Sequence, residues 1–228
     1  MLVKTKAIVK QNKKETPSVH SLVLELEEKI DFKAGQYVMI NVPEGDKILK
    51  RAYSIVSSPS KTDIELCIKI VDEGVASKYL CGLKQGDEMD LMGPMGVFIL
   101  SEPLEDSVVF LASGVGVAPF RSMINYLFEQ GFEGKIILFL GARTHDELIY
   151  KKEFEELALK HENFKFIPVV SREKCGEKQG HVQDVCEKYI KDLKNPGFYV
   201  CGLKNMVDET VEFLKNKGFS NIHYERYN

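Results

Sequence analysis

The sequence predicts two domains: an antiparallel β-barrel over residues 1–101, and a doubly wound α/β domain with a five-stranded parallel sheet over residues 102–228. Three observations lead to this fold class. A chain of 228 residues is long enough for two domains of roughly 100 residues each. Hydrophobic residues alternate with polar ones in the first part, whereas apolar strands precede amphipathic helices in the second. The pattern changes at the segment SEPLEDS, so we place the boundary near Ser101.

The first domain is predicted from runs with a period of two, which is the period of a half-buried strand. The apolar side chains of Ile64, Leu66, Ile68 and Ile70 alternate with more polar neighbours. Similar runs are VHSLVLEL, QYVMINV, RAYSIVSS and EMDLM, and the turn-forming segments between them are KAGQ, PEGD, SSPSKTD and KQGD. Many short strands at close spacing favour a small barrel, with one helical insert at residues 74–83.

The second domain is predicted from strands that alternate with helices, the pattern of a parallel sheet. The five strand-like runs are VVFLAS, KIILFLGA, FKFIPVVS, GFYVCG and NIHYERY. The four helix-like runs are APFRSMINYLFEQG, DELIYKKEFEELALK, HVQDVCEKYIKDL and NMVDETVEFLKNKG. Each helix follows a strand, so a helical crossover can connect each strand of the second domain to the next parallel strand.

Composition narrows the functional class. With 31 Lys and Arg against 34 Asp and Glu, the net charge is −3, which argues against a nucleic acid partner. The start of the chain lacks the apolar stretch of a signal peptide, and no apolar run is long enough to cross a bilayer, so we expect a cytoplasmic protein. The cysteines have neither disulfide-framework nor metal-ligand spacing, so we expect no metal site; they are Cys67, Cys81, Cys175, Cys186 and Cys201.

A glycine-rich turn lies between the first strand and the first helix of the second domain, in LASGVGVAPFRSM. Gly114 and Gly116 allow positive φ and close backbone approach, and Pro119 suits the first turn of a helix. The N–H groups that open this helix favour a phosphate, which indicates a dinucleotide site. The third glycine of the GxGxxG pattern is replaced by Pro119, so a tight turn without a ligand is the alternative.

Five motifs in chain order resemble the ferredoxin–NADP reductase superfamily. They are RxYS at 51–54, GxxS at 74–77, GPxG at 93–96, GVGVAP at 114–119 and CG at 201–202. The resemblance spans nearly the whole chain. It implies a flavin in the barrel and NADPH or NADH on the parallel sheet, with hydride passing from nicotinamide C4 to flavin N5 and electrons leaving to an acceptor. The cofactors supply this chemistry, and the protein supplies geometry and electrostatics.

The resemblance assigns flavin contacts in the barrel. Arg51 would bind flavin phosphate, Tyr53 would lie against the isoalloxazine ring, and Ser54 would reach N5 as a catalytic residue. Strict alternation places Ser54 on the face opposite Arg51 and Tyr53. The remaining flavin residues are those of the strand along the ring edge, Ile68, Lys69 and Ile70, and those at the start of the short helix, Gly74, Val75, Ala76 and Ser77. For this helix the alternative is an N-terminus held by its own capping, and Gly93, Pro94 and Gly96 are interpreted as structural.

The resemblance also assigns nucleotide contacts in the second domain. The turn residues are Gly114, Val115, Gly116, Val117 and Pro119. Cys201, with Gly202, would touch the nicotinamide as a catalytic residue, although inert packing is the alternative for a cysteine in an apolar strand. Arg143, Ser171 and Arg172 would hold the adenosine half, and the Ser-Arg pair modestly favours NADPH over NADH because guanidinium suits phosphate.

The C-terminal HYERYN resembles the tail that covers the flavin in this superfamily. Glu225 would be the acidic catalytic residue and Tyr227 the aromatic one over the flavin face. The alternative is an ordinary last strand with a frayed end, and Asn228 follows Tyr227.

These assignments predict a flavoprotein NAD(P)H reductase with FAD rather than FMN, which passes electrons to an external acceptor such as ferredoxin or a haem protein. The sequence shows neither a cysteine-rich ferredoxin domain nor clustered C-terminal cysteines, so we expect the acceptor to be a separate small redox protein. Two alternatives stay open: an NAD(P)H:free-flavin reductase, and an electron-transfer subunit of a larger complex.

Overall fold

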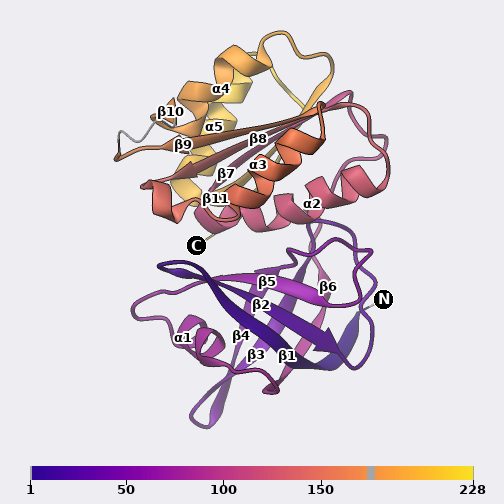
Figure 1. Ribbon diagram of the computed structural model, residues 1–228, viewed down its shortest axis with the longest axis vertical. Helices are drawn as coiled ribbons and strands as arrows, with labels where there is room; N and C mark the ends of the chain where they lie inside the picture. Colours follow the sequence, from indigo (N-terminus) through magenta and orange to yellow (C-terminus); the bar gives the residue numbers. More distant parts are fainter. Residues whose placement is uncertain (1, 174–177, 228) are drawn as a thin grey trace. The chain divides into compact units, whose positions relative to one another are not determined.

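The computed structural model describes residues 2–173 and 178–227 (Figure 1). The chain divides into two units. The barrel unit comprises Met1–Leu100 with Ala118–Gln130, and the α/β unit comprises Ser101–Val117 with Gly131–Asn228. The helix after the glycine turn thus groups with the barrel, and the domain boundary at residues 101 and 102 stays a prediction.

The barrel unit is built on a six-stranded antiparallel sheet in the order β4-β3-β6-β1-β2-β5. Its strands are β1 (Val3–Thr16), β2 (Val19–Leu26), β3 (Tyr37–Glu44), β4 (Lys47–Ser54), β5 (Ile64–Lys69) and β6 (Glu88–Met95). The sheet curls so that an isolated antiparallel bridge between Ile55 and Leu66 joins the end of β4 to β5. The N–H of Val56 also donates to the carbonyl of Glu65 at 2.7 Å. The predicted antiparallel barrel is therefore confirmed.

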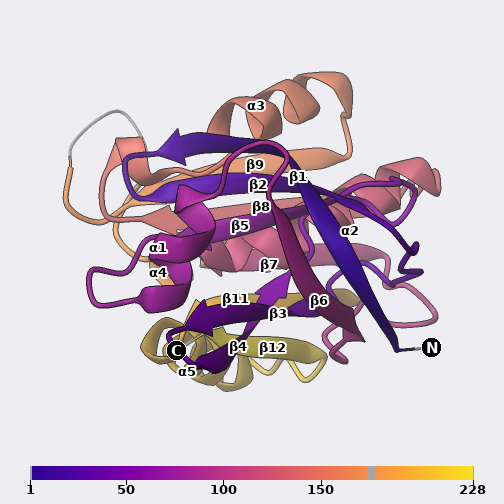
Figure 2. The same ribbon diagram turned by 90° about the horizontal axis from the view of Figure 1, so that it is seen from below.

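Period-two alternation explains this barrel, because one side chain in two points into its core. Val38, Ile40 and Val42 on β3 are fully buried, as are Leu22 and Leu24 on β2. Helix α1 (Val75–Gly82) lies beside β2 and β5 and buries Leu80 against the same core (Figure 2). The helix occupies the predicted insert.

Helix α2 (Ala118–Glu129) is held to the barrel by polar contacts. Nη1 of Arg121 lies 2.7 Å from the Glu65 carboxylate, and both side chains are largely buried. The hydroxyl of Ser122 donates to the carbonyl of Ser57 at 2.7 Å, and Ser58 donates to the Glu129 carboxylate. The strand predicted over residues 51–58 therefore ends at Ser54, and its last two serines bind a helix rather than only forming a turn.

The α/β unit contains a parallel sheet in the order β10-β9-β8-β7-β11-β12. Its strands are β7 (Ser107–Ser113), β8 (Lys135–Ala142), β9 (Phe164–Val170), β10 (Lys178–Gln179), β11 (Pro196–Leu203) and β12 (Ile222–Tyr227). This is the doubly wound order, in which the chain changes direction between β7 and β11. The fold class is confirmed, but the strand count of five was wrong. The sixth strand, β10, has only two residues, too few to give a periodic signal.

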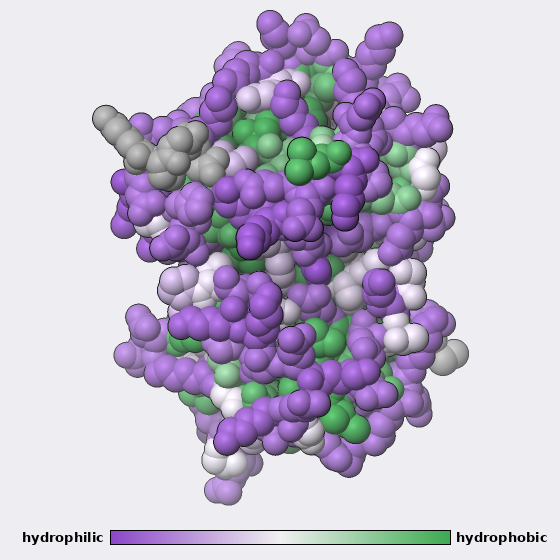
Figure 3. Space-filling view, in the orientation of Figure 1, coloured by the Kyte–Doolittle hydropathy of each residue, from purple (hydrophilic) through white to green (hydrophobic). Residues whose placement is uncertain are grey.

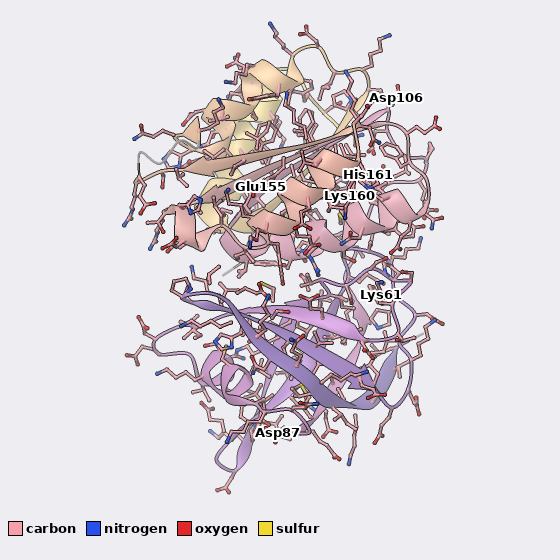
Figure 4. The ribbon with its side chains drawn as sticks, in the orientation of Figure 1. Lys61, Asp87, Asp106, Glu155, Lys160 and His161 are labelled. Atoms are coloured by element: carbon pink, nitrogen blue, oxygen red, sulfur yellow. The ribbon has the colours of Figure 1, made fainter. Side chains whose placement is uncertain are left out.

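Helices cover both faces of this sheet: α3 (Lys151–Lys160) on one, and α4 (Val182–Ile190) with α5 (Lys204–Asn216) on the other (Figures 1 and 2). On the α3 side, the ring of Phe154 packs on Phe166 of β9 at 5.4 Å between centroids. Charged residues line the outer side of α3, where Figure 4 shows Glu155 and Lys160. Hydrophilic residues dominate the visible surface in Figure 3.

The remaining two short elements are the 3-10 helices η1 (Gly114–Val117) and η2 (His145–Glu147).

A buried carboxyl group fixes the segment that enters the α/β unit. Glu105 accepts hydrogen bonds from Ser101 at 2.6 Å and from Asn221 at 2.8 Å. Tyr199, whose ring stacks on His223 with centroids 4.7 Å apart, accepts a hydrogen bond from the N–H of Ser101. These contacts tie residues 101–105 to the amino ends of β11 and β12.

No helix in the described ranges is both long enough and apolar enough to span a membrane.

Candidate functional site

The strand register decides the direction of the RxYS side chains. Across β3 and β4, Arg51 lies opposite Ile40 and Tyr53 lies opposite Val38. Residues directly opposite in an antiparallel pair share a face, so Arg51 and Tyr53 lie on the core side of the sheet. Ser54 pairs with Tyr37 and is buried on the other face. The structure therefore brings Arg51 and Tyr53 together and directs Ser54 away from them, so contact between Ser54 and flavin N5 stays a prediction.

Arg51 and Tyr53 have the chemistry that a flavin phosphate and ring require. Burial, followed by the nearby Cys81, raises the pKa of Tyr53 to about 12, while Arg51 opposes the shift. The phenol is therefore neutral at physiological pH. The exposed guanidinium of Arg51 donates to the carbonyl of Lys50 at 3.0 Å. No carboxylate within residues 2–173 and 178–227 forms an ion pair with Arg51, so its other N–H groups can bind an anion.

The start of α1 presents backbone donors rather than a hydroxyl. The Ser77 hydroxyl accepts the N–H of Val71 at 3.1 Å and donates to the carbonyl of Gly74 at 3.1 Å. A hydroxyl has one hydrogen to donate, so in this conformation Ser77 gives none to a phosphate. The Ser77 side chain is thus bound within its own loop, and the phosphate contact of this helix start stays a prediction. The N-cap position is Gly74, and no side chain caps the helix there. The first N–H groups of α1 are therefore available to bind a phosphate.

The third flavin element predicted from the sequence is the end of β5. Ile68 is fully buried, Lys69 is exposed, and the N–H of Ile70 donates to the carbonyl of Ser18 at 2.8 Å. Because β5 is the last strand of the sheet, its outer edge after the Leu66 bridge pairs with no strand among the described residues. That edge is compatible with the predicted backbone contacts to a flavin ring. Together with Arg51 and the start of α1, it gives a donor set that fits a flavin with a phosphate group.

In the α/β unit the glycine turn packs directly on the end of β11. An ideal Cβ on Gly116 would lie 2.3 Å from the carbonyl oxygen of Cys201 and 2.7 Å from Cα of Gly202. Gly202 has φ +149°, and a Cβ there would lie 2.2 Å from Oγ of Ser113. Only glycine fits either place. The turn and the Cys201-Gly202 pair, 85 or more residues apart in the chain, therefore meet at the topological switch point between β7 and β11, where such sheets bind ligands.

The rest of the turn has the predicted form. Gly114 has φ +53° and opens the 3-10 helix, in which Val117 is fully buried and Val115 half-buried. Helix α2 begins at Ala118 with Pro119 in its first turn, as predicted.

Cys201, Glu225 and Tyr227 form a cluster at the carboxyl edge of the sheet. Glu225 lies opposite Cys201 in the β11–β12 register. Burial strongly raises the pKa of the Cys201 thiol, Glu225 adds to the shift, and a hydrogen bond with the Tyr227 side chain opposes it. Burial also raises the pKa of Glu225. The thiol is thus un-ionised at neutral pH, which suits packing against a ligand and not nucleophilic attack.

Arg143, Ser171 and Arg172 meet at the ends of β8 and β9. The N–H of Arg172 donates to the carbonyl of Arg143 at 3.0 Å, and the hydroxyl of Ser171 donates to the carbonyl of Ala142 at 3.4 Å. Both arginines are exposed, and neither forms an ion pair with a carboxylate in the described part of the chain. Two guanidinium groups on adjacent strand ends provide donors for a phosphate. Lys174 and Cys175, which follow Arg172 closely in the sequence, lie outside the described residues.

Sequence reasoning missed three polar residues around these sites. The hydroxyl of Ser113 accepts the N–H of Leu203 at 3.3 Å, beside Gly202. Arg121 and Glu65 join α2 to β5 in the barrel unit. Their partners are 56 or more residues away, so no local pattern could have found them.

Comparisons with known proteins assign a family to each part. Residues 6–99 match the oxidoreductase FAD-binding domain, and residues 110–212 match the oxidoreductase NAD-binding domain. The first contains the Arg51, Tyr53 and Ser77 positions, and the second contains the glycine turn and Cys201.

Three relatives cover most of the chain. The phenol hydroxylase P5 protein of Acinetobacter pittii is 33% identical over 97% of this chain, which spans 65% of that relative's length. Ferredoxin–NADP reductase B of Sorangium cellulosum is 30% identical over 86% of this chain and 85% of its own length. A ferredoxin–NADP reductase of Neisseria gonorrhoeae, solved with bound FAD and NADP, superposes with a TM-score of 0.85 at 25% identity, covering 99% of this chain and 98% of its own. The chain therefore belongs to the ferredoxin–NADP reductase superfamily.

Proposed function

We propose that this chain is a flavin-dependent NAD(P)H oxidoreductase that passes hydride from nicotinamide C4 to flavin N5 and then delivers electrons to an external acceptor. The observation that carries the proposal is the succession of an FAD-binding and an NAD-binding domain family in one chain. When bound, the flavin converts a two-electron hydride donor into a source of single electrons.

The residues of the chain bind and orient the two cofactors. Arg51 and the N-terminal N–H groups of α1 hold the flavin phosphate, and Tyr53 contacts the ring. The glycine turn accepts the dinucleotide phosphates, and Arg143, Ser171 and Arg172 bind the adenosine half. Cys201 and Glu225 contact the nicotinamide end, Tyr227 covers the flavin face, and Ser54 acts near N5. Support comes from the exposed guanidinium groups of Arg51, Arg143 and Arg172, for which the described part of the chain shows no ion pair, and from the close approach of Gly116 to Cys201.

FAD is the proposed flavin, and NADPH is preferred to NADH. The FAD-binding domain family supports the first choice. The two arginines at the ends of β8 and β9 support the second, because a 2′-phosphate is present only in NADPH. The names of two relatives, a ferredoxin–NADP reductase and a toluate 1,2-dioxygenase electron transfer component, support a ferredoxin or an oxygenase component as acceptor. Three cysteines in the described part of the chain, Cys81, Cys186 and Cys201, are free thiols, which fits a cytoplasmic location.

The proposal is tested by purifying the chain and separating bound from free flavin by gel filtration. We expect a yellow protein whose flavin stays with it, and NADPH-dependent reduction of an added plant-type ferredoxin or cytochrome c. A colourless protein that rapidly reduces added FAD or FMN would favour the free-flavin reductase. A yellow protein without reductase activity on any artificial acceptor would favour the subunit of a larger complex.

A further inference from the structure

A side chain from strand β1 closes the C-terminal end of helix α1. Nδ2 of Asn12 lies 3.1 Å from the carbonyl oxygen of Leu80, 3.2 Å from that of Cys81 and 2.9 Å from that of Leu83. The last carbonyl groups of a helix have no partner within the helix. Asn12, about seventy residues away in sequence, brings an amide group with two hydrogens within hydrogen-bond distance of two carbonyls in the last turn of α1 and of the carbonyl of Leu83, the C-cap residue.

The other side of the Asn12 amide is also fixed. Its Oδ1 lies 2.8 Å from Nδ1 of His20 on β2. Because Nδ2 faces carbonyl groups, Oδ1 is the acceptor, and Nδ1 of His20 must carry a hydrogen. Burial, followed by the charge of Lys14, lowers the pKa of His20, so the imidazole is neutral with this hydrogen on Nδ1. His20 thus holds Asn12 in the orientation that binds α1.

Backbone contacts hold the segment after α1 against the same strand. The N–H of Gly86 donates to the carbonyl of Val9 at 2.8 Å, and the N–H of Val9 donates to the carbonyl of Asp87 at 2.9 Å. Figure 4 labels Asp87 in this turn. Strand β1 therefore fixes both the last turn of α1 and the chain that leaves it, whereas the N-terminal end has no side-chain cap.

We propose that Asn12 is a positioning residue for flavin, because it sets where the N-terminal N–H groups of α1 point. This inference rests on the proposed function, in which those N–H groups bind the flavin phosphate. A helix of eight residues has little cooperative stability of its own, so its position depends on the contacts at its ends and on buried residues such as Leu80. Donors at its C-terminus also complement the negative end of the helix dipole, whose positive end faces the phosphate.

Asn12→Asp tests this role, because aspartate keeps the size of the side chain but replaces two donors with acceptors. The dissociation constants of FAD and of riboflavin, which lacks phosphate, are measured for the flavin-free protein by fluorescence titration. We expect the dissociation constant of FAD to rise roughly tenfold, the value of one or two hydrogen bonds. That of riboflavin should change less than about twofold, because riboflavin lacks the phosphate that the N-terminal N–H groups of α1 would bind.

Asn163→Asp is the matched control. Nδ2 of Asn163 likewise bonds two backbone carbonyls, those of Phe132 and Gly134, each at 2.9 Å, but in the α/β unit. It should leave both flavin constants unchanged. His20→Leu removes the hydrogen bond that orients Asn12, and it should raise the dissociation constant of FAD by a smaller factor. This variant tests the role of Asn12 if Asn12→Asp does not fold.

Unchanged FAD affinity in Asn12→Asp would overturn the inference. An equal loss for FAD and riboflavin would also overturn it, because Asn12 would then stabilise the whole barrel without specific effect on the phosphate. A wild-type protein that binds neither flavin would instead refute the proposed function on which the inference rests.

Discussion

Glu225 lies directly opposite Cys201 in the register of β12 and β11, and burial raises the pKa of both side chains. The Tyr227 side chain, two residues on, hydrogen-bonds the thiol. Beside them Gly116 packs on the Cys201 carbonyl. A carboxyl, a thiol and a phenol are thus gathered where the glycine turn meets the end of β11, and each can be tested separately.

Cys201→Ala should slow flavin reduction by NADPH at least roughly tenfold while leaving flavin affinity unchanged, because the thiol shapes the nicotinamide contact. Stopped-flow absorbance under anaerobic conditions measures this rate. Cys186→Ala is the control: Cys186 is also fully buried, but it lies on α4 and packs in the core of the α/β unit. It should lower thermal stability without changing the rate. An unchanged rate in Cys201→Ala would remove Cys201 from the site.

Glu225→Gln should raise the thermal unfolding midpoint at pH 7 by about 1–3 °C and have little effect near pH 4. The folded-state pKa of Glu225 is raised, so at neutral pH the native state holds an ionised carboxylate that burial disfavours. This cost disappears as the pH falls and the carboxyl becomes protonated in both states. Midpoints measured from pH 4 to pH 8 check the sign. A stabilising effect that grows toward low pH would contradict it.

Arg172→Gln should reduce kcat/KM for NADPH roughly tenfold and leave that for NADH nearly unchanged, because charge-assisted bonds to the 2′-phosphate are lost. Steady-state assays with ferricyanide compare the two nucleotides. Lys165→Gln removes a positive charge near the opposite, amino end of β9, the strand that Arg172 follows, and should affect neither. Equal losses with both nucleotides would show that Arg172 does not read the phosphate.

Gly116→Ala should destabilise the protein by about 3 kcal/mol and impair nucleotide binding, because the new methyl group collides with the backbone of Cys201. Gly82→Ala is the matched control. A Cβ at Gly82 meets nothing within 4 Å, so this substitution should change stability by less than about 1 kcal/mol. Urea denaturation and NADP⁺ titration give the two readouts. A Gly116→Ala protein with wild-type stability would mean that the turn is not packed on β11.

Local patterns in the sequence were sufficient for the main elements. VHSLVLEL became β2 with the same bounds, Val19–Leu26, and its burial follows the alternation only in part, since the neighbours Ser21 and Leu22 are both buried. The turn glycines were predictable because positive φ and close approach have a strong residue preference. The position of Cys201 was predictable because the carboxyl edge of a parallel sheet is set by strand order.

Contacts between distant segments could not be predicted. Ser57 and Ser58 were interpreted as a turn before Pro59, whereas they bind Ser122 and Glu129 of α2. Asn12 was an unremarked polar residue in a strand, and only the fold places it at the end of α1. Such polar pairs depend on tertiary structure, which leaves no periodic signal in the sequence.

The most direct test of the central claim is an anaerobic titration of the purified protein with NADPH and with NADH, followed by its flavin absorbance. We predict that about one equivalent of NADPH per bound flavin bleaches the flavin spectrum, since a hydride carries the two electrons that full reduction requires. We also predict that NADPH acts faster than NADH. A protein that binds no flavin, or whose bound flavin stays oxidised with both nucleotides, would contradict the assignment of this chain as an NAD(P)H oxidoreductase.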